Sequence, residues 1–289
     1  MADRLEALLD RFPVSARLFH SGPLHGSRDF ARAGDGGQLH LVRRGSITVI
    51  RDGAPVVVIA TPSVLLAPRP LGLRLIAEPE SGADLASAHL GFDGGSANPM
   101  ASALPDVLCL PLADIHGASE VLALLFEEAF NERCGRHALV DRLFEVVLIQ
   151  ILRQLMESGR IHGGLLAGLA HPRLRNALVA MHETPARDWS LDALAESAGM
   201  SRSAFAGTFR DTVGCTPGHY LQGWRIGLAQ QGLRRGRALK VIASDVGYGS
   251  EAALSRAFKA QVGASPRDWR TLAVRDRSPQ ASKRTPVPK

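Results

Sequence analysis

The sequence predicts an α+β protein of two domains, in which an N-terminal antiparallel β barrel with two helices precedes a C-terminal all-α domain. Three observations predict this fold class. Short apolar segments broken by glycine, proline and aspartate occupy residues 12–112, the apolar spacing becomes helical from residue 118, and residues 201–220 are repeated at 250–269. A chain of 289 residues that is 45% hydrophobic can form a core in each domain.

Six segments of the barrel region are rich in β-forming side chains, and turn-forming residues separate them. Arg-Gly-Ser at 44–46 and Asp52-Gly53 are typical of hairpin turns, because glycine and aspartate tolerate the positive φ that such turns need. Short strands joined by tight turns predict an antiparallel barrel or sandwich. The segments are LHLVRR, SITVIR, APVVVIAT, SVLLAP, GLRLIA and ADLASAHLGF.

Helical spacing of apolar residues predicts two helices, at 118–132 and 136–158. The second is apolar on more of its circumference than a surface helix requires. Two interpretations remain open: this helix packs against the barrel, or it forms a dimer interface through residues such as Leu143 and Ile151. The glycine pairs and alanines of residues 159–170 then predict a flexible linker.

The C-terminal domain contains an internal repeat with a constant offset of 49 residues. The segment SRSAFAGTFRDTVGCTPGHY aligns with SEAALSRAFKAQVGASPRDW. A repeat of this kind predicts two copies of one supersecondary unit. Because a short helical pattern and a glycine precede each copy, we predict two helix-turn-helix units, at 190–211 and 239–261.

Each unit has the turn chemistry of a helix-turn-helix. Gly199 and Gly247 end the first helix of each unit, because a helix C-terminus favours a left-handed residue. Ser201 and Ser250 are predicted to cap the second helix, and the extra residue Gly249 predicts that the two turns differ in detail. The predicted buried faces are Leu191, Leu194, Ala195, Ala198, Phe205, Phe209 and Val213 in the first unit, and Val241, Ile242, Val246, Leu254, Phe258 and Val262 in the second.

Positive charge is concentrated in the C-terminal part of the chain. Residues 171–289 hold 19 Lys and Arg against 9 Asp and Glu, whereas residues 1–170 hold 15 against 19. An excess of cations favours binding to phosphates, since neutralising them releases counterions. The hypothesis that individual cations contact DNA applies first to a cluster between the two units, which is Arg234, Arg235, Arg237 and Lys240.

The chain from about 171 to 272 strongly resembles the DNA-binding domain of AraC/XylS-type transcription regulators. LDALAESAGMSRSAFAGTFRDTVGCTPGHYLQGWRIGLAQQGLRRG and VIASDVGYGSEAALSRAFKAQVGASPRDWR carry the resemblance. It implies two helix-turn-helix subdomains joined by a connecting helix at about 220–235, with two recognition helices that enter successive major grooves of double-stranded DNA. The polar, basic residues 273–289 are predicted to be disordered.

The resemblance also implies which residues contact DNA. The exposed recognition-helix positions are Arg202, Ser203, Ala206 and Gly207 in the first unit, and Ser250, Glu251, Ala252, Ser255 and Arg256 in the second. Candidates for phosphate contact are Ser201, Arg210, Arg225 and Lys259.

The two recognition helices differ in what they can offer to a base. Gly207 stands where the family commonly has an arginine, so the first helix lacks a side chain there, and glycine inside a helix costs about 1 kcal/mol relative to alanine. Arg256 is the best candidate for reading guanine, because an arginine can bond both O6 and N7. The alternative for Arg256 is a solvated or phosphate-contacting role. Glu251 is better explained by the helix dipole than by reading cytosine.

The N-terminal part is similar to the cupin-like sensory domain of one subgroup of these regulators, through LHLVRRGSITVI and VLLAPRPLGLRL. The resemblance implies a sensory and dimerisation domain at 1–158, a homodimer, an unidentified small-molecule effector and contact with RNA polymerase. The whole chain is then expected to be an effector-responsive, sequence-specific transcription regulator rather than an enzyme.

The spacing of histidines in the barrel region indicates whether this domain could bind a metal ion. Metal-binding cupins carry a His-x-His cluster, whereas His20, His25, His40 and His89 are isolated in this sequence. We therefore expect no metal, no cofactor and no catalytic residue. A cupin-type enzyme fused to the DNA-binding domain remains the less favoured alternative. A four-thiolate zinc site, as in Ada-like repair proteins, needs more cysteines than the three present.

A redox-responsive regulator is another alternative. Cys134 lies beside Arg133, Arg136 and His137, whose positive charge favours a reactive thiolate. The three scattered cysteines indicate a reducing compartment, and neither a signal sequence nor an apolar run of membrane-spanning length is present. We therefore expect a cytoplasmic protein with no membrane contact. The other two thiols, which we expect to be structural, are Cys109 and Cys215.

Overall fold

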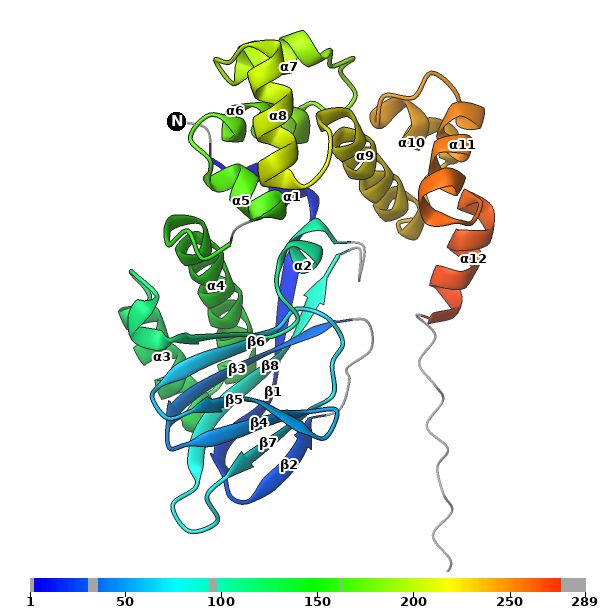
Figure 1. Cartoon of the computed structure of the whole chain (residues 1–289). Helices are drawn as coiled ribbons and strands as arrows, with labels where there is room; N and C mark the ends of the chain where they lie inside the picture. Colours follow the sequence, from blue (N-terminus) through cyan, green and yellow to red (C-terminus); the bar gives the residue numbers. More distant parts are fainter. Residues whose placement is uncertain (1–2, 31–35, 94–97, 162, 277–289) are drawn as a thin grey trace, which may run out of the picture. The chain divides into compact units, whose positions relative to one another are not determined.

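Nine β-strands in two antiparallel sheets form the N-terminal part of the computed structural model, which describes residues 3–30, 36–93, 98–161 and 163–276 (Figure 1). One sheet has the order β1-β8-β3-β6-β9 and the other β2-β7-β4-β5. The predicted antiparallel domain is thus confirmed. The strands are β1 Val14–Leu24, β2 Ser27–Phe30, β3 Gly37–Arg44, β4 Ile47–Arg51, β5 Ala54–Ile59, β6 Ser63–Ala67, β7 Leu73–Ala77, β8 Ala83–Phe92 and β9 Leu108–Pro111.

An apolar core fills the space between the two sheets. Strand β7 shows the expected alternation, since every second residue from Leu73 to Ala77 is buried. All five residues of β6 are buried, which indicates cover on both faces of that strand. The core comprises Leu24, Phe30, Val42, Ile47, Val49, Ile59, Leu65, Ala67, Leu73, Leu75, Ala77, Ala83 and Leu85.

The two predicted turns have different roles. Asp52 and Gly53 both have positive φ, 51° and 82°, and they join β4 to its antiparallel partner β5 as a hairpin. The prediction of a second hairpin at 44–46 is wrong, because β3 and β4 belong to different sheets. There, Gly45 carries the chain from one sheet to the other. A Cβ on Gly45 would lie 2.4 Å from the Gly82 carbonyl oxygen, so only glycine allows this close approach.

Helix α4 covers the free edge of β1. The carboxylate of Asp141 accepts a hydrogen bond from the Leu18 backbone N–H at 2.7 Å, and Glu145 accepts one from Ala16 at 3.2 Å. Two carboxylates one helical turn apart thus satisfy edge N–H groups that would otherwise be free to pair with another strand. The helices of this part are α1 Glu6–Arg11, α2 Pro99–Ala103, α3 Ser119–Phe130 and α4 Arg136–Glu157.

Of the two interpretations left open for α4, the burial of Leu143 and Ile151 favours packing against the barrel. Leu143 is 8% exposed and Ile151 is fully buried, whereas Leu139 and Val146 are 41% and 38% exposed. Packing against the barrel therefore explains the wide apolar face of α4, and its outward face is a different set of residues. None of the helices in the described ranges is both long and apolar enough to cross a bilayer.

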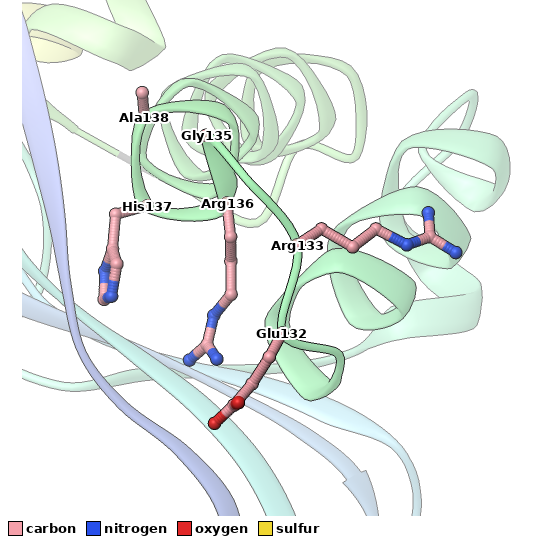
Figure 2. A pocket seen from close by; sticks show the side chains of 6 residues that line it. All are labelled: Glu132, Arg133, Gly135, Arg136, His137 and Ala138. Atoms are coloured by element: carbon pink, nitrogen blue, oxygen red, sulfur yellow. The ribbon is translucent and has the colours of Figure 1, made fainter.

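The loop between α3 and α4 forms an open pocket with a volume of about 360 Å³ (Figure 2). Arg133 leaves the pocket to pair with Glu127 at 2.7 Å and Glu128 at 2.9 Å. Arg136 donates through Nη2 to the Ser21 hydroxyl at 2.9 Å. The lining residues are Glu132, Arg133, Gly135, Arg136, His137 and Ala138.

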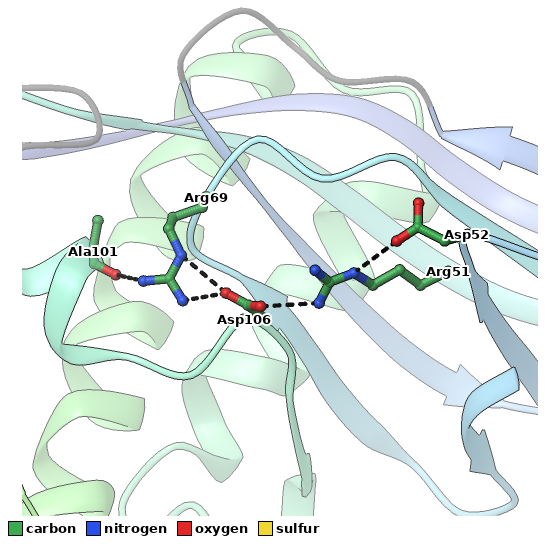
Figure 3. Close-up of polar contacts among 5 residues, drawn as sticks. All are labelled: Arg51, Asp52, Arg69, Ala101 and Asp106. Atoms are coloured by element: carbon green, nitrogen blue, oxygen red, sulfur yellow. Dashed lines mark hydrogen bonds and ion pairs between the residues drawn. The ribbon is translucent and has the colours of Figure 1, made fainter. Parts of the chain in front are cut away.

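An ion-pair network fastens α2 to the barrel (Figure 3). Asp106 accepts hydrogen bonds from Arg69 and, at 3.0 Å, from Arg51 on β4. Arg69 also donates to the Ala101 carbonyl of α2 at 3.0 Å. The hydrogen bonds from Arg69 and Arg51 hold the pKa of Asp106 below its usual range.

The chain divides by its contacts into two compact units. The first comprises Met1–Glu183 and Leu191–Pro217, and the second comprises Thr184–Ser190 and Gly218–Lys289. The remaining helices of the first unit are α5 Gly164–Ala170, α6 Leu174–Glu183, α7 Leu191–Ser197 and α8 Arg202–Val213. The second compact unit contains α9 Pro217–Arg234, except for its first residue, which belongs to the first compact unit. It also contains α10 Leu239–Asp245, α11 Glu251–Val262 and α12 Pro266–Asp276.

Part of the segment predicted to be a flexible linker is a buried helix. Helix α5 lies within 159–170, and Leu165, Leu166 and Leu169 are buried in it. It contacts α2 and α4 as well as α6 and α8. The glycines of this segment therefore permit close packing, since a Cβ on Gly168 would come within 2.6 Å of the Leu178 side chain. Of the tail predicted to be disordered, residues 273–276 belong to helix α12, so the prediction is wrong for them, and residues 277–289 lie outside the described residues.

A polar cluster interrupts the apolar interior near β1, β3 and β8. The imidazole of His40 is fully buried, with Nδ1 2.8 Å from the Ser87 hydroxyl and Nε2 3.1 Å from the Gln38 side-chain oxygen. Burial, with smaller contributions from His20 and His89, lowers the pKa of His40 to about 3. Burial likewise lowers the pKa of His182 on α6 to about 3.

These two histidines predict a loss of stability in mild acid. The unfolded chain binds protons below a pKa of about 6.5, whereas the folded chain does not bind them until about pH 3, so the free energy of unfolding falls as pH drops through this window. At pH 5.5 each histidine should lower it by about 1.4 kcal/mol relative to pH 8. Urea unfolding across this pH range measures the slope.

The matched variant for this measurement is His40→Gln. It should unfold with a shallower pH dependence than the wild-type protein, whatever its absolute stability. An identical slope in both proteins would contradict the assignment.

Candidate nucleic-acid interface

The two predicted turns share one backbone structure. Gly199 has a φ of +62°, and the Met200 N–H returns to the Ala195 carbonyl at 2.9 Å. Gly247 has a φ of +82°, and the following N–H likewise returns to the Ala243 carbonyl, at 2.8 Å. Both are left-handed helix ends of the kind that favours glycine, which confirms the prediction.

The predicted serine caps are also confirmed. The Ser201 hydroxyl accepts from the Ala204 backbone N–H at 3.4 Å, and the Ser250 hydroxyl accepts from that of Ala253 at 3.1 Å. The two serines differ in backbone conformation, with φ of −68° and −160°, as the extra residue in the second turn predicts. Each cap sets the first residue of a recognition helix.

Aromatic side chains fix which face of each recognition helix is turned inward. Phe205 and Phe209 are fully buried on α8, and Leu254 and Phe258 are fully buried on α11. Val262 is half-buried. One predicted core residue is wrong: Val241 is 46% exposed, because α10 turns Ile242, Ala243 and Val246 inward instead.

The opposite faces of the two helices present equivalent positions. On α8 the exposed residues Ser203, Gly207 and Arg210 recur at spacings of four and three. Forty-nine positions later, the exposed residues of α11 are Ala252, Arg256 and Lys259. Ala206 and Ser255, also at equivalent positions, are half-buried at the margin of each face. The side chains named from the sequence therefore do share one face on each helix.

The two faces differ in charge and reach. In the middle and at the end of this face, α11 has the exposed cations Arg256 and Lys259, whereas at the equivalent positions α8 has Gly207, which lacks a side chain, and Arg210. Arg202, at the start of α8, forms an exposed ion pair with Asp192 at 3.4 Å, and such pairs contribute little to stability. The first face is therefore short of side chains that can reach a base edge.

Arg225, predicted to contact phosphate, instead donates hydrogen bonds to backbone carbonyls of the second compact unit. Its Nε donates to the Pro185 carbonyl at 2.7 Å and its Nη2 to the Arg187 carbonyl at 2.8 Å. Its guanidinium also lies 5.9 Å from the centre of the Tyr248 ring. No local sequence pattern indicates this role, because the acceptors are backbone oxygens about forty residues away.

The cations between the two repeats are partly engaged as well. Arg237 forms an ion pair with Asp245, and the guanidinium of Arg234 lies 4.9 Å from the centre of the Trp269 ring. Arg235 and Lys240 are exposed.

The cysteines give no support to redox chemistry. Cys134 is exposed, but the two arginines beside it in the sequence bond to other groups, Arg133 to Glu127 and Glu128 and Arg136 to Ser21. Burial raises the pKa of the half-buried Cys109 and Cys215 thiols, which disfavours the thiolate. Within the described ranges, His, Cys, Asp and Glu side chains do not gather in threes as they would around a metal ion.

The position of Gly207 predicts that replacing it with alanine stabilises the protein. It is exposed inside α8, and an added Cβ would meet nothing within 4 Å. Gly207→Ala should raise the free energy of unfolding by about 1 kcal/mol, because glycine is the poorer helix former. Thermal unfolding measures the change. Gly199→Ala, at a positive φ, is the control that should lower stability, and a lower Tm for Gly207→Ala would contradict the helical placement.

Comparison with known proteins identifies both parts of the chain. Residues 3–157 match the family described as Cupin, and residues 194–271 match a helix-turn-helix domain. A putative AraC-like transcription regulator of Streptomyces lividans is 40% identical over 171 residues, which cover 58% of this chain and 56% of that protein. The HTH-type transcriptional regulator AlkR of Acinetobacter baylyi is 36% identical over 188 residues, covering 63% and 61%. The chain thus spans little more than half the length of these relatives.

Among solved structures, the DNA-binding domain of the global transcriptional factor AdpA, in complex with a target DNA, is 31% identical. It covers 38% of this chain and 99% of the AdpA domain, with a TM-score of 0.35. The family matches show that the chain belongs to the cupin family through its N-terminal half, and that a helix-turn-helix domain follows in its C-terminal part.

Proposed function

We propose that this protein is a sequence-specific DNA-binding transcription regulator, and not an enzyme. The observation that carries the proposal is the pair of equivalent exposed faces on α8 and α11, each set by a glycine turn, a serine cap and a buried apolar stripe. The surplus of cations in residues 171–289 supports a polyanionic partner, which is double-stranded DNA. The regulator names of the relatives support the same function.

The two helices contribute unequally to this proposal. Arg256 reads a base in the major groove, while Lys259 and Arg210 contact phosphates. The first helix contributes through Arg202 and Ser203 and through the close approach that Gly207 permits. Sequence preference should accordingly be stronger in the half of the site that α11 contacts.

We further propose that an effector acts through the cupin-like domain at 1–158, with residues 159–170 as the connection to the DNA-binding domain at 171–272. Helix α5 supports this coupling, because it contacts α2 and α4 of the N-terminal part and also α6 and α8, of which α8 is the second helix of the first helix-turn-helix unit. A Cβ on Gly168 would lie 2.9 Å from Val213 at the end of α8. A shift of α2 or α4 would therefore reach a recognition helix through packed side chains.

Selection of bound fragments from genomic DNA tests the DNA-binding proposal. The wild-type protein should enrich a motif, and Arg256→Ala should relax one base of it at a cost of about 1–3 kcal/mol. Lys259→Ala is the matched control: it should weaken all sequences alike and reduce the slope of log affinity against log salt by about 1. Binding by the wild-type protein without any motif would contradict sequence-specific regulation.

A homodimer and contact with RNA polymerase complete the proposed assembly. The outward residues of α3 and α4, which are Leu124, Leu139 and Val146, are large and exposed, and they support a second copy as the dimer partner.

Sedimentation of a Leu139→Asp/Val146→Asp variant tests the dimer. Because both side chains are exposed, the variant should stay folded and sediment as a monomer. Leu143→Asp is the contrasting control, since a charge in the core should unfold the domain. A folded double variant that still sediments as a dimer would remove this face as the interface.

A further inference from the structure

The segment Thr184–Ser190, which joins α6 to α7, belongs by its contacts to the second unit. We call it the clasp segment. It closes on itself, because the Trp189 indole N–H donates to the Thr184 carbonyl at 3.0 Å and the Arg187 guanidinium lies 4.1 Å from the centre of the Trp189 ring. The segment is therefore a folded loop rather than an extended connection.

Arg225 on α9 holds this loop by two backbone carbonyls. The planar guanidinium donates to Pro185 and Arg187 at the same time, at 2.7 and 2.8 Å. Hydrogen bonds from a charged donor are stronger than neutral ones, and two from one rigid group also fix orientation. A lysine could supply the charge but not this fork.

Gly247 lies against the same stretch of the loop. A Cβ on Gly247 would come within 2.7 Å of the Cα and the carbonyl oxygen of Ala186. The turn of the second helix-turn-helix unit thus touches the residue between the two that Arg225 holds. The contact is with backbone, which cannot rotate away as a long side chain can, so the loop and this turn fit together only with glycine at 247.

The clasp segment ends where the first helix-turn-helix unit begins. Ser190 is followed directly by α7, which starts at Leu191. With an unrestrained loop of this length, the start of α7 could occupy many positions, because each residue of an extended chain spans up to about 3.3–3.6 Å. A loop held by Arg225 and Gly247 has lost most of that freedom.

We propose that Arg225 is a positioning residue that limits the spacing between the two DNA half-motifs the protein accepts. The inference rests on the proposed DNA-binding function. Two tethered reading units bind together only when their connection allows both to reach their half-motifs, so a stiff connection selects one spacing and a loose one tolerates several. Arg225 thereby sets specificity without contacting a base.

The test uses the full-length protein and a set of DNA duplexes in which the two half-motifs from the genomic selection are moved apart or together by one and two base pairs. The wild-type protein should prefer one spacing by about tenfold or more, and Arg225→Ala should reduce that preference to about threefold or less. Base preference within each half-motif should not change. Arg225→Lys should fall between the two.

Trp189→Phe is the second variant, because it removes the indole N–H that closes the clasp segment on the Thr184 carbonyl and leaves both recognition helices and their turns unchanged. It should relax the spacing in the same way, which keeps the test valid if Arg225→Ala does not fold. Circular dichroism at the assay temperature shows which variants are folded. Arg256→Ala is the contrast, and it should relax one base but leave the spacing preference intact.

Three outcomes overturn the proposal. Folded Arg225 and Trp189 variants that lose affinity equally at every spacing would show that the clasp segment only stabilises the fold. A wild-type protein that binds all spacings alike would show that nothing restrains them. A wild-type protein that enriches no motif would overturn the proposed function itself. This failure is distinguished from the other two because it is seen in the genomic selection, before any spacing is tested.

Discussion

The exposed surfaces on which any reading of DNA depends are set by two residues whose backbone is left-handed. Other residue types reach the φ of Gly199 and Gly247 only at a cost of roughly 1–2 kcal/mol, so these turns require glycine. Each turn reverses the chain within a few residues and delivers it to a serine cap. The cap fixes where the next helix begins. That starting point decides which side chains of the helix are buried and which are exposed.

Much of the fold follows from local signals, and the failures have a common cause. Strands β4 to β8 fall within five of the six segments predicted from β-forming residues and turns, and β3 begins two residues before the remaining segment. Strand β1 was not predicted, because it contains glycine, proline and a bulge at Phe19, and its edge is satisfied by Asp141 and Glu145 from more than 120 residues away. A sequence pattern records period and turn chemistry, but not which distant group completes a hydrogen bond.

The candidate interface divides in the same way. The caps, turns and buried stripes recur at a fixed offset, so their positions could be read from the repeat. The roles of charged residues could not, because Arg225 binds carbonyl oxygens, which every residue possesses and no motif marks. The choice between barrel packing and a dimer interface for Leu143 stayed open, and the helix within the predicted linker was missed, for a related reason: apolar and small residues indicate that packing occurs, but not which neighbour is packed against.

Because α4 covers the edge of β1, it limits where the chain can be truncated. Strand edges are templates for a further strand, and here the edge is closed by two carboxylates on a helix that lies beyond the last strand in the chain. A fragment that stops after β9 would retain every strand of the barrel yet expose this edge. Aggregation would then compete with folding, so α4 is the natural C-terminal limit of any soluble fragment, and also the last element that a ribosome must release before the barrel is protected.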